Sequence, residues 1–160
     1  SQPTANKFLE YAREIFLIDT TDFFSYSFAR QKTNPHKIYV ADPGLHEALG
    51  FKFSENFGKI FENIVYLEYR RKGKEIFYWK EKNEVDLIIR RGNKIDKAVN
   101  ICWELDEKNL TREISGLEEA MEKFNLQEGE IITTGYAETI KIKKGKKILV
   151  KNFYTLLEEK

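Results

Sequence analysis

Two acidic residues stand one position apart at the start of an apolar segment. Glu84 and Asp86 flank Val85, and the apolar run continues at residues 87–89. In a β-strand, residues i and i+2 project from the same face, so both carboxylates would lie together at the rim of a sheet. Charge in such a place is costly unless it is compensated. A metal ion would compensate it and would suit phosphodiester cleavage, whereas an internal ion pair is the structural alternative.

The apolar periodicity predicts the elements that position these acids. Helices are expected over residues 54–71, 110–124 (with Thr111 as a cap) and 153–158. Strands are expected over residues 76–79, 85–89, 97–104 and 130–134, followed by a hairpin around Gly145. This order predicts an α/β (α+β) fold with a mixed central sheet flanked by helices.

The first 42 residues have a different character. Apolar residues between Phe8 and Phe16 recur at helical spacing, and strands are expected over residues 23–28 and 37–42. A helix followed by a hairpin resembles the back half of a winged helix. The break at Asp42-Pro43-Gly44 therefore predicts two parts, a partial winged helix over 1–42 and an α/β domain over 43–160. Because the chain starts within the expected helix, we expect it to be a fragment of a longer protein.

Composition narrows the classes of partner and compartment. The 27 Lys and Arg residues nearly balance 26 Asp and Glu residues, so overall charge does not indicate a nucleic-acid-binding protein. A single cysteine excludes a disulfide framework and favours the cytoplasm, and no segment is long enough to span a membrane. The Lys- and Glu-rich composition is typical of a thermophile.

Local basic runs remain candidates for phosphate contacts. The alternative for both runs is a solvated surface. The candidate DNA-binding residues are Arg70, Arg71, Lys72, Lys74, Lys80, Lys82, Lys141, Lys143 and Lys144.

The order helix, hairpin, strand, helix, strand resembles the restriction-endonuclease-like core, the PD-(D/E)XK superfamily. The resemblance is carried by Glu62, by Asp86 after Glu84-Val85, and by Asn100-Ile101-Cys102 on the next strand. In active members, a helix Glu, the Asp and an acid-x-Lys pair surround Mg²⁺ or Mn²⁺. The resemblance therefore implies Glu62, Asp86 and Glu84 as catalytic candidates. Here the acid-x-Lys position reads Asn-x-Cys, and this departure from the pattern of active members argues against nuclease activity.

Further inferences concern how the site could be completed. The metal-ligand candidates are Asp86, Glu62, Asn100 and Glu104, the last expected on the same strand face as Asn100. Lys80 or Lys82 could supply the missing cation, and Arg112 could face the acids as a counter-ion. Cys102 is expected to be a small buried hydrophobic residue.

A narrower resemblance covers nearly the whole chain. Residues 16–18, 37–45, 58–66, 78–79, 84–86 and 112–117 look like the C-terminal half of archaeal-type AAA P-loop ATPases. In those proteins an ATPase module precedes a winged helix and a nuclease-like domain. No Gly-x-x-x-x-Gly-Lys-Ser/Thr loop is present, so no ATP site is expected in this chain.

Three functions follow from this resemblance. The first is a catalytically degenerate domain that binds DNA or a partner and regulates an archaeal ATPase. The second is an active Mg²⁺-dependent endonuclease, and the third is a purely structural or assembly domain. The expected partners are DNA, the chain's own ATPase module and a second copy of the chain.

Overall fold

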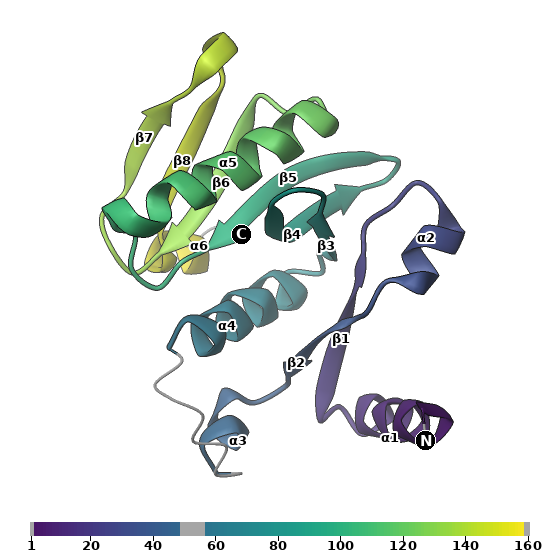
Figure 1. Ribbon diagram of the computed structural model, residues 1–160. Helices are drawn as coiled ribbons and strands as arrows, with labels where there is room; N and C mark the ends of the chain where they lie inside the picture. Colours follow the sequence, from purple (N-terminus) through teal and green to yellow (C-terminus); the bar gives the residue numbers. More distant parts are fainter. Residues whose placement is uncertain (1, 49–56, 159–160) are drawn as a thin grey trace.

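The computed structural model describes residues 2–48 and 57–158, which form one eight-stranded mixed sheet with helices on both faces (Figure 1). The strand order is β2-β1-β3-β4-β5-β6-β8-β7. The strands are β1 (Ile18–Phe23), β2 (Lys37–Val40), β3 (Glu75–Lys80), β4 (Glu84–Arg91), β5 (Lys94–Ile101), β6 (Glu128–Thr133), β7 (Glu138–Lys141) and β8 (Lys147–Asn152). The helices are α1 (Gln2–Glu14), α2 (Phe28–Thr33), α3 (Pro43–Ala48), α4 (Phe57–Arg71), α5 (Glu107–Lys123) and α6 (Phe153–Glu158), with a 3₁₀ turn at Lys143–Gly145. The predicted mixed sheet flanked by helices is confirmed.

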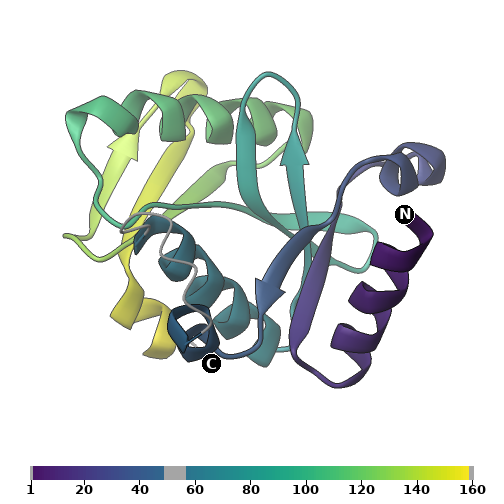
Figure 2. The same cartoon turned by 60° about the horizontal axis from the view of Figure 1, so that its bottom comes forward.

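Each face of the sheet has its own apolar core. On one face, Leu117 and Met121 of α5 pack in a cluster with Ile88 and Ile131. On the other face, Val65 of α4 and Leu156 of α6 belong to a second cluster with Leu87 and Val99. The two cores account for the arrangement in Figure 2, where α5 and the pair α4 and α6 lie on opposite sides of the strands. Residues 57–71 and 107–123 are helical because their apolar side chains recur with the helical period.

The strand that carries the acids contains a bulge. Phe77 of β3 pairs with Ile88 of β4, but Trp79 pairs with Val85, so Asp86 and Leu87 together face a single residue, Tyr78. A bulge of this kind redirects side chains locally. The bulge places Asp86 at the point in β4 where the alternation of side chains between the two faces of the sheet is interrupted.

The predicted order of elements after residue 57 is confirmed, and the errors lie at boundaries. The third predicted strand ends at Ile101 rather than residue 104, so the expectation that Glu104 shares a strand face with Asn100 is wrong. The cap of α5 is Asp106, which forms a capping box with Asn109, and not Thr111. The part of the expected helix before residue 57 lies outside the described residues.

The N-terminal hairpin also differs from the prediction. Its first strand covers Ile18–Phe23 rather than residues 23–28, because the backbone after Phe24 leaves the sheet and turns into α2. The helices α2 and α3 were not predicted. Strand β1 pairs antiparallel with β2 and also parallel with β3, so one sheet continues from the hairpin into the rest of the chain. The domain boundary between residues 42 and 43 stays a prediction.

Within the described ranges, no helix has the length and apolar character needed to cross a membrane.

Candidate acidic cluster and cleft

One amine joins three carboxylates from two separate elements. Nζ of Lys37, on β2, lies 3.1 Å from Oε1 of Glu62 on α4, 2.9 Å from Oε1 of Glu84 and 3.1 Å from Oδ1 of Asp86 on β4. The structure thus brings the helix acid and the strand acids together, as the sequence predicted. We call Lys37, Glu62, Glu84 and Asp86 the acidic cluster.

No sequence motif pointed to Lys37 as a member of the cluster. It lies in the N-terminal hairpin, 25 residues before Glu62 and 49 before Asp86. The two lysines proposed instead, Lys80 and Lys82, behave differently. Lys80 reaches only Glu84, at 3.4 Å, and Lys82 lines the nearby cleft. The only local signal was the alternation of Lys37 and Tyr39, which places both side chains on one face of a short strand.

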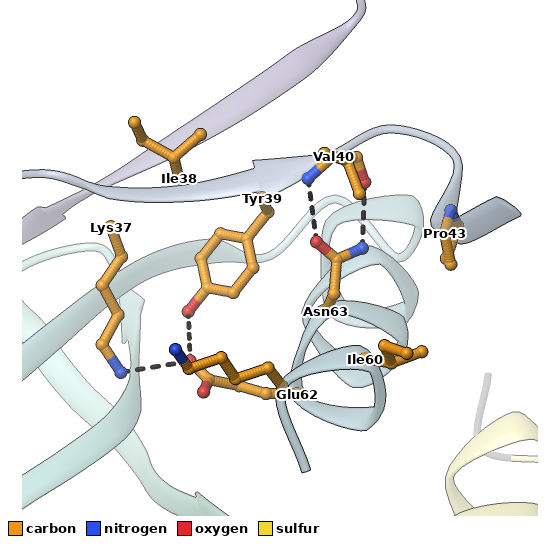
Figure 3. A pocket seen from close by; sticks show the side chains of 9 residues that line it. Lys37, Ile38, Tyr39, Val40, Pro43, Ile60, Glu62 and Asn63 are labelled. Carbon is orange, nitrogen blue, oxygen red and sulfur yellow. Dashed lines mark hydrogen bonds and ion pairs between the residues drawn. The ribbon is translucent and has the colours of Figure 1, made fainter. Parts of the chain in front are cut away.

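Polar contacts hold β2 against α4, as Figure 3 shows. The hydroxyl of Tyr39 donates to Oε1 of Glu62 at 2.9 Å, and the ring stacks on Tyr66 with centroids 3.7 Å apart. The side-chain amide of Asn63 accepts from the Val40 N–H at 2.8 Å and donates to the Val40 carbonyl at 2.9 Å, like a paired strand. These contacts fix the position from which Lys37 extends to the acids.

The charges in the cluster alter the acidities of its members. Burial, reinforced by the charge of Glu62, raises the pKa of Asp86 to about 6, although Lys37 and the Ile101 N–H act in the opposite direction. Burial also acts to raise the pKa of Glu84, but Lys37 and Lys80 hold it below its ordinary value. Burial alone would lower the pKa of Lys37, yet Asp86 and Glu62 raise it well above the ordinary value. Lys37 is therefore a permanent cation at neutral pH.

The side chains of Asn100 and Cys102, at the acid-x-Lys position, form hydrogen bonds within the protein. The amide of Asn100 is buried, where it accepts from the Asp86 N–H at 3.3 Å and donates to Oε2 of Glu113 at 2.8 Å. The thiol of Cys102 is half-buried and donates to the Glu104 carbonyl, and burial and then the charge of Glu113 raise its pKa to about 11. Both side chains thus position neighbouring groups. Whether Asn100 or Glu104 binds a metal stays a prediction.

A cleft of about 700 Å³ opens beside the cluster. Its lining includes the three acids, Trp103, Glu104 and a set of cations, namely Lys59, Lys80, Lys82 and Arg112. Arg112 does not pair directly with the cluster acids: its Nη2 lies 2.6 Å from Oε1 of the buried Glu113. Helix α5 packs closely against β4 at Gly116. A Cβ added to Gly116 would lie only 2.8 Å from the Glu84 carbonyl oxygen.

The cluster does not fit a metal ion while Lys37 occupies it. The Lys37 amine lies 2.9–3.1 Å from one oxygen of each carboxylate, so it occupies the position between the acids that a metal ion would need. Across residues 2–48 and 57–158, no group of three or more His, Cys, Asp or Glu side chains is arranged to hold a metal.

The basic runs are largely engaged within the molecule. Arg70 contacts Asp19 at 2.6 Å, and Arg71 contacts Glu68 at 2.8 Å. Lys72 donates to the Leu156 carbonyl, and Lys144 contacts Glu122 at 2.6 Å. Lys74 is half-buried, and Lys141 and Lys143 are exposed. Their role in DNA binding stays a prediction.

Comparisons with known proteins give a family and one distant relative. A family model described as a domain of unknown function, DUF4143, matches residues 57–153, from the start of α4 to the start of α6. The uncharacterized protein MJ1544 of Methanocaldococcus jannaschii is 40% identical over 125 residues, which cover 74% of this chain and 27% of that protein. This chain therefore spans about a quarter of its relative's length. No solved structure matches the chain.

Proposed function

The chain belongs to the DUF4143 family, and from its acidic cluster we propose that it is a nuclease-like module without nuclease activity. In this proposal it binds DNA or a partner protein and regulates an archaeal AAA ATPase, of which it is the C-terminal part. The ATPase assignment rests on the resemblance of its motifs to such proteins and on a relative almost four times longer than the aligned segment.

The contact of one lysine amine with three carboxylates carries the proposal. Metal-dependent nucleases need their carboxylate oxygens free for Mg²⁺, which is held by hard oxygen ligands in near-octahedral geometry. Here Lys37 supplies the positive charge that a metal would supply, because its Nζ lies 2.9–3.1 Å from Glu62, Glu84 and Asp86. An internal cation can stabilise the fold, but it cannot lower the pKa of an attacking water as a metal does.

The residues at the acid-x-Lys position support the same conclusion. A lysine at position 102 would orient a nucleophile, and an acid at position 100 would bind a metal. In this chain both side chains are used for internal hydrogen bonds, to Glu113 and to the Glu104 carbonyl.

One observation favours a second candidate, a Mg²⁺-dependent endonuclease. Lys37 restores a lysine beside the acids, although it comes from β2 rather than β5. If a metal displaced the amine by a small distance, Lys37 could stabilise charge that develops on a scissile phosphate.

Plasmid nicking in the presence of Mg²⁺ or Mn²⁺ separates the two candidates. The proposal expects no nicking by the wild-type chain. Nicking that disappears in both Asp86→Ala and Lys37→Met would establish the endonuclease instead. Glu10→Ala serves as the matched control, because Glu10 is an exposed acid on α1. Nicking that survives in every variant would indicate a contaminating nuclease.

Binding is tested separately by gel shift with a DNA duplex over a range of salt concentrations. Contacts with phosphates should weaken as salt rises. The expected effect of Lys141→Ala and Lys143→Ala is weaker binding, because both side chains are exposed. Absence of any salt-dependent shift would leave a partner protein as the object of binding.

A further inference from the structure

An exposed aromatic residue follows the end of each of three parallel strands. Strands β5, β6 and β8 are adjacent and parallel, so their carboxyl ends meet at one edge of the sheet. Trp103 follows β5, Tyr136 follows β6 and Tyr154 follows β8, with 40%, 96% and 72% of their surfaces exposed. Phe57, at the start of α4, is 51% exposed and stacks on Trp103 with centroids 5.6 Å apart. We call these four residues the aromatic edge.

Hydrogen bonds hold the backbone of the aromatic edge in place. The Trp103 carbonyl accepts from the Thr134 hydroxyl at 2.6 Å and from the Thr133 hydroxyl at 3.2 Å. The Asn152 amide donates to the Thr134 and Gly135 carbonyls, at 3.0 and 2.7 Å. The segments that carry Trp103, Tyr136 and Tyr154 are thereby connected, so the rings are presented from a single framework.

Cations lie next to this edge in the cleft that Trp103 also lines. Lys59 is exposed, and Arg112 has 74% of its side chain exposed while the buried Glu113 orients its guanidinium. Most acids of the cleft already have internal cationic partners, in Lys37 and Arg112. Glu104 is an exposed acid in the same lining and opposes anion binding.

We propose that the aromatic edge and the adjoining cleft bind single-stranded nucleic acid. Exposed rings beside cations are the combination that such ligands require, since bases stack on aromatic faces and phosphates contact basic side chains. Only unpaired bases offer their faces for stacking, so a duplex should bind less well at this edge. The inference deepens the proposed function, because it names the form of nucleic acid that the module would bind.

The test is fluorescence anisotropy with a labelled oligodeoxythymidylate of about 12 nucleotides, a length typical of single-strand sites. A duplex of equal length is measured alongside. Trp103→Ala and Tyr136→Ala should each raise the dissociation constant by roughly fivefold to a hundredfold, the range reported for loss of one stacked base. Tyr11→Ala is the matched control. Tyr11 is 59% exposed on α1, which lies far from α6 in both Figure 1 and Figure 2.

Charge variants provide an independent measurement. Lys59→Ala and Arg112→Ala should weaken binding and reduce its dependence on salt. Glu104→Gln should strengthen it, because it removes the opposing charge. Trp103 packs against Phe61 and could affect folding, so Tyr136→Ala, at a fully exposed position, keeps the result decisive.

Several outcomes would overturn the inference. These are no binding of the single strand, tighter binding of the duplex, or equal affinity in the Tyr136, Trp103 and Tyr11 variants. None of them changes the nicking result, which decides the proposed absence of nuclease activity. Nicking by the wild-type chain would in turn reject that proposal and leave the single-strand measurement intact.

Discussion

Replacement of Lys37 by methionine should reveal the energetic cost of removing the cation that three carboxylates share. Met keeps most of the length and apolar surface of the lysine stem but removes its charge. Exposed ion pairs contribute up to about 1 kcal/mol, whereas breaking a buried pair costs about 3–5 kcal/mol. The side chains of Lys37, Glu62 and Asp86 are 21%, 23% and 20% exposed, so the cluster is intermediate between an exposed and a buried ion pair. We expect the free energy of unfolding to fall by about 2–3 kcal/mol at neutral pH.

The loss should depend on pH in a defined direction. Without Lys37, the negative charge of the neighbouring carboxylates raises the pKa of Asp86 further, and protonation of Asp86 relieves the repulsion. Asp86 has a pKa of about 6 even with Lys37 present, so at pH 5 it is largely neutral in both proteins. The difference between variant and wild type should therefore shrink to about 1 kcal/mol at pH 5.

Urea denaturation at pH 5 and at pH 7.5, followed by tryptophan fluorescence, measures both values. Lys7→Met is the matched control, because Lys7 is exposed on α1, and it should change stability by less than about 0.5 kcal/mol. Equal losses of stability in Lys37→Met and Lys7→Met at both pH values would show that the amine does not compensate the acids.

Three further predictions concern the framework of the site. Gly116→Ala should destabilise the fold by about 1–3 kcal/mol in calorimetry, since its Cβ would lie 2.8 Å from the Glu84 carbonyl; an unchanged melting temperature would contradict this. Asn63→Leu should cost about 1–3 kcal/mol in urea denaturation, because both polar groups of Val40 lose their partner. NMR titration should place the pKa of Asp86 near 6, above its ordinary 3.8. Because the folded state then binds the proton more tightly than the unfolded chain, Asp86 makes stability rise as pH falls from about 6 to about 4; a pKa below 4 would refute the burial argument.

Local sequence patterns were sufficient to predict most of the helices and strands. The helix over 57–71, the strands on either side of Gly92 and the hairpin around Gly145 follow from helical or alternating periodicity and from glycine at turns. Gly92 adopts a φ of 61°, which glycine tolerates without strain. The end of β5 was not predicted correctly, because the chain after Ile101 is positioned by the hydrogen bond from Thr133 of β6 to the Trp103 carbonyl. That bond joins residues 30 positions apart and leaves no trace in local sequence.

The sequence by itself determined that Glu84 and Asp86 stand together at the start of a strand, and that a helix carries Glu62. It also determined that β5 lacks an acid-x-Lys pair. Only the tertiary structure decided what compensates the acids. Lys37 reaches them because β2 joins the same sheet and is held to α4 by Tyr39 and Asn63. Periodicity reports which face of an element is buried, but it carries no information on which distant side chain will meet that face.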